Sequence, residues 1–237
     1  MREPAFSLLD IMALAPGLVE ASDWANWAAR GVWPPENSLP ATPLIPPMQA
    51  RRMSQAARLA VQLALTLITR WRPGYLICVS RHGELQRTQG LLQQLVCAQP
   101  LSPTDFSLSV HNTVAGLATI AAGVTIPATS IAAGEEGLHA GFIEACARLA
   151  VHDTPVLLLC FDGPVPDFYQ PWVPAQLPVH AVAMVLTRGQ QWRYQGSEAA
   201  DPVAPALSQP LQFWRSWLRG EPECRLDGGA QQRVWRC

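Results

Sequence analysis

The chain has 237 residues, of which 49% are hydrophobic and 15% charged, and its formal net charge is -1. That length suffices for a full hydrophobic core, and the composition excludes disorder over most of the chain. The near-neutral charge argues against a nucleic-acid partner, and the 17 basic residues are all arginine, which excludes Schiff-base and P-loop lysines.

Strands and helices alternate along the sequence. Three proline-rich stretches, at 33–47, 163–178 and 201–210, are predicted to be loops because neither helices nor strands tolerate that density of proline. Apolar periodicity predicts, in chain order, a strand over 6–14, helices over 23–29 and 54–71, a strand over 75–80, a helix over 84–97, helical structure in the second half of 102–123, a short strand over 129–133, a helix over 136–151, strands over 155–161 and 179–187 with 191–194 as a candidate partner, a helix over 207–218 and a strand over 232–236.

The pattern predicts an α/β domain in which a sheet is covered by helices on both faces, because apolar strands alternate with helices. The helix over 23–29 is predicted to be capped by Ser22, with Gly31 just past its end.

Cysteine usage and the chain start indicate the compartment. The six cysteines form no C-x-x-C pair and match no zinc spacing, so we expect no metal and no cofactor. No secretory signal opens the chain, and the most apolar helical run, 59–68, is too short to span a bilayer. We therefore expect a cytoplasmic protein with reduced thiols and no membrane span.

A short motif, Ser80-Arg81-His82-Gly83-Glu84, follows the predicted strand at 75–80. A strand followed by Arg-His-Gly-Glu is similar to the signature of the histidine phosphatases, which would make His82 the phosphorylated nucleophile and Arg81 the phosphoryl clamp. That family also has a second histidine, usually followed by glycine, and no other histidine here precedes a glycine. The alternative interpretation is a strand-to-helix turn to which Gly83 gives backbone freedom.

Two adjacent carboxylates, Glu135 and Glu136, lie between Gly134 and Gly137 at the start of the predicted 136–151 helix. They could perform acid/base chemistry if burial raised the pKa of one of them. Alternatively, they are the solvated first turn of that helix, whose positive end favours negative charge. No G-x-S-x-G or Walker motif is present, whereas a Cys–His pair brought together by the fold stays open.

The stretch from 101 to 150 resembles the β-ketoacyl-ACP synthases. Ser102-Pro103, Asn112, Ala115-Gly116, Pro127 and the helix from Glu136 occur in that family's order, without a gap. The resemblance implies a thiolase-like fold, here as a single N-terminal-type half with a central mixed sheet. It implies that 1–200 form the ketosynthase-like domain and that 201–237 are a C-terminal extension, a helix plus a short strand, packed on the same domain.

The family's catalytic groups are missing from the places where the resemblance puts them. Its nucleophile is a cysteine at a helix N-terminus, where backbone N–H groups lower the thiol pKa. The equivalent position here is Glu135, or Gly134 with a one-residue shift. The family's two histidines, in His-Gly-Thr and Asn-x-His contexts, are also absent. The resemblance therefore implies no catalytic residues and no enzyme activity in this chain.

A subset of the family, the chain length factors, fits this loss, and the sequence resembles the short chain-length-factor-like subunits of bacterial aryl polyene clusters. By that resemblance its partner is a catalytic β-ketoacyl-ACP synthase in a heterodimer, which an acyl carrier protein visits. The segment 104–112 would cross between subunits, so the acyl-tunnel or interface candidates are Phe106, Leu108, Val110, His111 and Asn112. The alternatives are a histidine-phosphatase-like enzyme using Arg81-His82-Gly83-Glu84 and a free-standing degenerate condensing enzyme.

Overall fold

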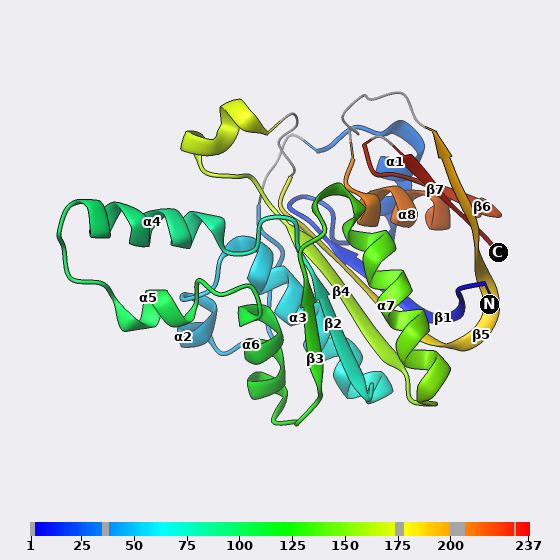
Figure 1. Cartoon of the computed structure of the whole chain (residues 1–237), viewed down its shortest axis with the longest axis horizontal. Helices are drawn as coiled ribbons and strands as arrows, with labels where there is room; N and C mark the ends of the chain where they lie inside the picture. The colour runs from blue at the N-terminus through cyan, green and yellow to red at the C-terminus, as the bar shows by residue number, and fades with distance from the viewer. Residues whose placement is uncertain (1–2, 35–37, 174–177, 200–206, 230) are drawn as a thin grey trace.

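The computed structural model describes residues 3–34, 38–173, 178–199, 207–229 and 231–237. These residues form a seven-stranded mixed sheet with helices on both faces (Figure 1), which confirms the predicted α/β class. The strands are β1 (Ala5–Leu14), β2 (Tyr75–Val79), β3 (Ala128–Ile131), β4 (Val156–Asp162), β5 (His180–Ala199), β6 (Glu223–Asp227) and β7 (Gln231–Arg236).

The strand order is β3-β2-β4-β5-β7-β6, and β1 also pairs with β5. The strands β3, β2 and β4 are parallel, whereas β5 is antiparallel to β4, β1 and β7, and β6 is antiparallel to β7. The parallel strands are continuous apolar runs because both of their faces are covered. Every side chain from Val156 to Phe161 of β4 is at most 2% exposed.

The helices divide between the two faces of the sheet (Figure 1). One face is covered by α3 (Gln55–Trp71) and α6 (Thr113–Ala122), and the other by α7 (Gly137–Val151), α8 (Gln209–Leu218) and α1 (Ala21–Arg30). The shorter elements are α2 (Pro47–Ala50), α4 (Leu85–Val96), α5 (Pro103–Ser107) and the 3₁₀ turns η1 (Gly134–Glu136) and η2 (Asp167–Trp172).

Alternate side chains of each central strand lie in two separate hydrophobic cores, one on each face of the sheet. In β2, Ile77 and Val79 join the core under α7, whereas Leu76 and Cys78 join the core under α3 and α6. Successive side chains of a strand point to opposite faces, so one apolar run supplies both cores. The sheet is thus packed on both faces, and it positions the loops that follow its strands.

The long helix α3 begins and ends as its sequence predicts. The Ser54 hydroxyl accepts a hydrogen bond from the Ala57 N–H at 3.2 Å, which satisfies one free donor of the first turn. At the other end Arg72 has a left-handed backbone, with a φ of 47°, and Pro73 follows it. Proline cannot continue a helix, so the chain turns there into β2.

The predicted cap of α1 is wrong. The helix begins one residue before Ser22, and Asp23 accepts a hydrogen bond from the Glu20 N–H at 2.9 Å, so that Glu20 is the cap residue. The predicted end is right, because Gly31 is left-handed and its N–H donates to the Trp27 carbonyl at 2.7 Å.

The strand at 179–187 and its candidate partner at 191–194 are two parts of one strand, β5, instead of a hairpin. The first part pairs with β4 and the second with β7, and β1 pairs with residues of both parts, so no turn separates them. Gly189 lies between the two parts, and its lack of a side chain allows Ser7 of β1 to approach the β5 backbone closely.

Other boundaries also differ from prediction. The first proline-rich loop ends where α2 begins, the second contains η2, and Pro210 of the third lies in the first turn of α8. The parts of these loops at 35–37, 174–177 and 201–206 lie outside the described residues. The sequence predicts neither α5 nor β6, because a five-residue helix and a polar edge strand leave little periodic signal.

The C-terminal segment packs on the rest of the chain. Helix α8 contacts α1 and α7, and β7 extends the sheet by pairing with β5. The boundary expected at 200/201 falls among residues 200–206, which are not described. Across the described ranges, the structure contains no helix long and apolar enough to span a bilayer.

Candidate functional site

The carboxyl ends of β2 and β4 meet at one edge of the sheet, and Asp162 organises the turn that follows β2. Its carboxylate accepts hydrogen bonds from the Ser80 hydroxyl at 2.8 Å and from the Arg81 N–H at 3.0 Å. The Ser80 oxygen in turn accepts from the Gly83 N–H at 2.7 Å, and Gly83 is left-handed with a φ of 55°. The turn is therefore fixed by a buried network, and it needs glycine at its end.

This network argues against the phosphatase interpretation of the motif. The backbone N–H groups of Arg81 and His82 donate to the Asp162 carboxylate, and the Arg81 guanidinium is already paired with Glu135. A second negative charge would be repelled there. Burial lowers the pKa of His82, and its Nε2 is buried without a hydrogen-bond partner. A phosphoryl group would therefore have to compete with Glu135 for Arg81.

The two adjacent carboxylates, Glu135 and Glu136, lie where β3 ends and α7 begins. Glu135, in η1, forms an ion pair with Arg81 at 3.2 Å, and both side chains are 23% exposed. Gly134 precedes it with a left-handed φ of 56°. This position thus holds a carboxylate paired with an arginine, and neither side chain carries a thiol or a hydroxyl.

Burial raises the thiol pKa of three cysteines in β2, α7 and β4. Burial raises the pKa of Cys146, in the middle of α7, to about 12. Burial also raises the pKa of Cys78 to about 12 and that of Cys160 still further in the same direction. Because only the thiolate is nucleophilic, a raised pKa disfavours reaction of these thiols near neutral pH. The described residues also contain no cluster of three His, Cys, Asp or Glu side chains that could hold a metal ion.

A buried Ser–His contact lies between β5 and α8. The Nδ1 of His180 faces the Pro178 carbonyl at 2.8 Å, so Nδ1 carries the proton and Nε2 accepts from the Ser208 hydroxyl at 2.9 Å. His180 is fully buried, and burial lowers its pKa. A neutral, enclosed histidine of this kind holds α8 to the sheet.

The tunnel and interface candidates lie on an arm made of α4 and α5, which projects from the sheet (Figure 1). Phe106, in α5, is 62% exposed, Val110 is exposed too, and Leu108 is partly buried. Arg87 of α4 fixes the arm, because it forms an ion pair with Asp105 of α5 and donates to the Arg52 carbonyl at 2.7 Å. The arm therefore presents apolar side chains from a rigid support.

The last two candidates lie where the arm rejoins the body. The Nε2 of His111 is 3.0 Å from the Ser80 carbonyl oxygen, and its ring packs against Gly83. Asn112 is exposed at the start of α6. The fold thus brings His111 beside the Asp162 network, whereas it leaves Phe106 and Val110 facing outward on the arm.

A cleft of about 710 Å³ separates the start of α4 from the segment 163–170. Its wall includes His82, Glu84 and Leu85 on one side and Phe168 of η2 on the other. Glu84 is buried and accepts a hydrogen bond from the Ser54 hydroxyl at 2.8 Å, and burial raises its pKa. A smaller cavity of about 320 Å³ shares Glu84 and continues toward the arm.

Sequence reasoning missed Asp162, the Ser54–Glu84 contact and the His180–Ser208 contact. A signal existed for Asp162, because it ends an apolar strand next to Gly163 and parallel strands end at the same edge of a sheet. No comparable signal exists for Ser208, because it lies 28 positions from His180 in the sequence and contacts it only in the folded chain.

Comparison with known proteins identifies the family and the fold. The family described as "Beta-ketoacyl synthase, N-terminal domain" matches residues 24–236. A chain from the complex of a ketosynthase (ApeO) with its chain length factor (ApeC) from Xenorhabdus doucetiae is 33% identical, with a TM-score of 0.92 over 98% of this chain and 99% of that chain. A search of curated proteins gives no significant match.

Two more distant structures share the fold alone. The ishigamide ketosynthase/chain length factor has a TM-score of 0.61 and 12% identity, over 84% of this chain and 68% of that chain. A β-ketoacyl synthase from Burkholderia phymatum STM815 has a TM-score of 0.57 and 9% identity, over 91% of this chain and 69% of that chain. The fold is thus the thiolase-like fold of ketosynthases, and the chain belongs to the β-ketoacyl synthase N-terminal domain family.

Proposed function

We propose that the protein is a non-catalytic, chain-length-factor-like partner of a β-ketoacyl-ACP synthase and that it forms or shapes the acyl tunnel in aryl polyene biosynthesis. One observation carries the proposal. Over nearly the full length of both chains, the protein is 33% identical to a chain from a complex of a ketosynthase with its chain length factor. Identity at that level over a matched length favours the same kind of assembly.

The lack of catalytic activity is supported by the chemistry at the start of α7. The turn Gly134–Glu136 contains neither a thiol nor a hydroxyl, and Arg81 neutralises Glu135. Burial keeps Cys146 protonated three turns away. In the complex, condensation would take place in the ketosynthase, and the acyl carrier protein would deliver its substrate there.

The docking of the ketosynthase is assigned to the end of the molecule that carries β3 and the arm. Among the described residues β3 pairs only with β2, so its other edge has free N–H and C=O groups. The arm beside it exposes Phe106 and Val110 together with Leu95 and Val96 of α4. An apolar surface next to an open strand edge is typical of an obligate interface. We propose that Phe106, Leu108, Val110, His111 and Asn112 contact the partner or its acyl chain.

We also propose a cytoplasmic location and no cofactor. The support for the location is that all six cysteines are free in the structure, as is usual for proteins in a reducing compartment.

The test is co-expression of the chain with an aryl-polyene-type ketosynthase from the same genome. We expect the two to purify as a stoichiometric heterodimer, and we expect polyene synthesis by the pair but not by either subunit alone. Two results would overturn the proposal: acylation of the isolated chain by an acyl carrier protein, followed by intact mass, or hydrolysis of p-nitrophenyl phosphate that His82→Ala abolishes.

A further inference from the structure

The arm made of α4 and α5 has no part in either hydrophobic core. The two core clusters on the faces of the sheet, and the partly buried side chains packed against them, include none of residues 85–110, all of which the structure describes. Only Leu91 of α4 is buried, and α5 contains no buried residue. The apolar packing that fixes helices such as α3 and α7 therefore does not fix the arm.

The base of the arm is also hollow on both sides. The cleft of about 710 Å³ separates the start of α4 from the segment 163–170, and the cavity of about 320 Å³ lies between the arm and the start of α3. Leu91, Arg87 and Asp105 line this smaller cavity opposite Met53 and Ser54. Because close packing is missing here, the arm depends on polar contacts for its position.

Arg87 joins both helices of the arm to the body of the protein. It lies in the first turn of α4 and pairs with Asp105 in the first turn of α5. It also donates to the Arg52 carbonyl, in the segment before α3, at 2.7 Å. A guanidinium can hold these groups at once because its N–H donors form a fixed planar fork.

The contacts of Arg87 continue into the body through Glu84. The Nε of Arg87 lies 4.0 Å from the Glu84 carboxylate, which accepts from the Ser54 hydroxyl at 2.8 Å. The side chain of Arg87 is only 20% exposed, so salt screens its contacts less than those of a surface ion pair. His111, 3.0 Å from the Ser80 carbonyl oxygen, fixes the chain only where it returns to the body.

We infer that Arg87 is the positioning residue of the arm, and that its contacts with Asp105 and the Arg52 carbonyl set the place at which the arm presents Phe106 and Leu108 to the ketosynthase. The identity of that partner rests on the proposed function. An arm that is already in place loses less conformational freedom on docking than a loose one, so these contacts favour association. Their loss should leave the sheet folded and weaken docking.

The first test is amide hydrogen exchange in the full chain. Arg87→Ala should speed exchange in α4 and α5 about tenfold and leave exchange in β4 unchanged, because the arm lies outside both cores. Unchanged exchange in the arm would overturn the inference.

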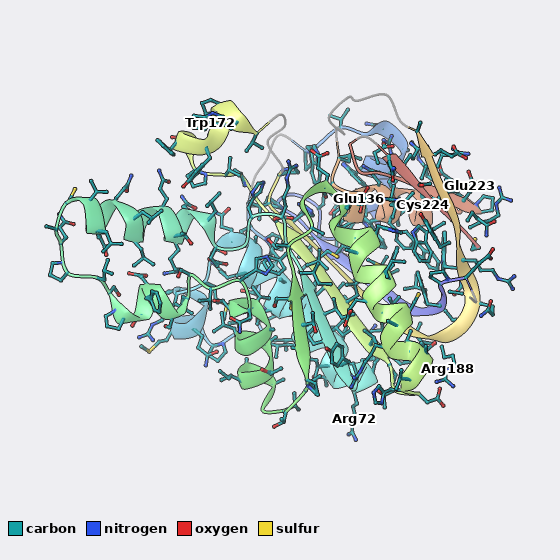
Figure 2. The ribbon with its side chains drawn as sticks, in the orientation of Figure 1. Arg72, Glu136, Trp172, Arg188, Glu223 and Cys224 are labelled. Carbon is teal, nitrogen blue, oxygen red and sulfur yellow. The ribbon has the colours of Figure 1, made fainter. Side chains whose placement is uncertain are left out.

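Arg188→Ala is the matched control for this test. Arg188 also lies near an aspartate, Asp153 at 3.8 Å, and donates to a backbone carbonyl, that of Leu149 at 3.0 Å. Figure 2 shows Arg188 near the end of α7 and well away from the arm. Exchange in α4 and α5 should therefore not change in this variant, and faster exchange there would mean that the effect of Arg87→Ala is not specific to the arm.

The second test is competition for the ketosynthase. A tagged aryl-polyene-type ketosynthase is co-expressed with the natural and variant chains, and their ratio in the purified complex is measured by mass spectrometry and divided by their ratio in the soluble extract. Arg87→Ala should be captured about tenfold less than the natural chain, and Arg188→Ala equally well. Equal capture of Arg87→Ala would overturn the inference.

A double-mutant cycle shows whether Arg87 and Asp105 act as one contact. Asp105→Ala should reproduce part of the loss of capture, and the double variant should be no worse than Arg87→Ala alone. Fully additive losses would contradict the inference. Failure of the proposed function would have a different signature, because the natural chain would then not be captured either, whereas hydrogen exchange would still report whether Arg87 fixes the arm.

Discussion

The guanidinium of Arg81 lies 3.2 Å from the carboxylate of Glu135 and joins the turn after β2 to the turn after β3. The two residues are 54 positions apart in the sequence, but β2 and β3 are parallel neighbours, so both turns emerge at the same edge of the sheet. The pair therefore links two loops at the same edge of the sheet, and Glu135 lies directly before the first turn of α7.

The Arg81–Glu135 pair is expected to contribute little to stability. Both side chains are partly exposed, so a double-mutant cycle with Arg81→Ala and Glu135→Ala should give a coupling of about 0.2 to 1 kcal/mol. The measurement is urea unfolding of the four proteins. A coupling of several kcal/mol would mean that the pair is far more buried than its geometry indicates.

The start of α3 gives a sharper stability prediction. Ser54→Ala should lower the free energy of unfolding by about 1 to 2 kcal/mol, because the hydroxyl both caps α3 and donates to Glu84. Ser22→Ala is the matched control and should change it by less than about 0.5 kcal/mol, since Ser22 does not cap α1. Equal losses in the two variants would refute the assignment of Ser54 as the cap.

The buried Glu84 should make stability depend on pH. Burial raises its pKa above the ordinary 4.5, so the folded state holds this proton more tightly than the unfolded state. Its contribution is full below pH 4.5 and is lost as pH rises through the raised pKa. Glu84→Gln cannot ionise, so it should gain stability relative to the natural chain as pH rises from about 4 to about 7 in urea unfolding.

Glu223 provides a control of opposite sign. Its pKa is lowered, chiefly by the hydrogen bond from Arg236, so its contribution is present above pH 4.5 and is lost as pH falls through the lowered pKa. Glu223→Gln should therefore lose stability relative to the natural chain over the same rise in pH. The same trend for both variants would contradict the assigned causes.

The sequence predicts those parts of the fold whose local pattern and tertiary role agree. The strand at 155–161 is an unbroken apolar run because it is buried on both faces, and Ser54 and Pro73 mark the two ends of α3. The predicted break in β5 is wrong because Arg188, Gly189 and Gln190 interrupt its apolar run, whereas pairing with β1 continues on both sides of them.

The candidate site also has a part that the sequence predicts and a part that it does not. The resemblance predicts Glu135 at the start of α7, where the structure places it. The arginine partners of the two carboxylates could not be predicted. Arg81 reaches Glu135 because β2 and β3 pair in parallel, and Arg233 reaches Glu136 from a hairpin 97 residues away. Such contacts depend on the completed sheet and leave no periodic signal in the sequence.

The packing of α7 on the sheet tolerates no added methyl group. A Cβ atom at Gly141 would lie 2.8 Å from Leu158 Cδ1 and 3.1 Å from Val79 Cγ2, inside a closed core. Gly141→Ala should therefore cost about 1 to 2 kcal/mol despite the better helix propensity of alanine. Gly116→Ala, where α6 leaves open space, should instead stabilise by about 0.5 to 1 kcal/mol. Thermal unfolding of both variants checks the contrast.

Phe106 tests the arm as a functional surface. Because its ring is exposed in this chain, Phe106→Ala should change the free energy of unfolding by less than about 0.5 kcal/mol. In the complex with the ketosynthase, the same change should weaken binding or alter the length of the polyenes, measured by analytical ultracentrifugation and by mass spectrometry of the products. Val96→Ala is the control, because it removes another exposed apolar side chain of the arm, 88% exposed at the end of α4 and outside the predicted crossing segment 104–112. Unchanged products together with unchanged binding in Phe106→Ala would remove Phe106 from both the tunnel and the interface.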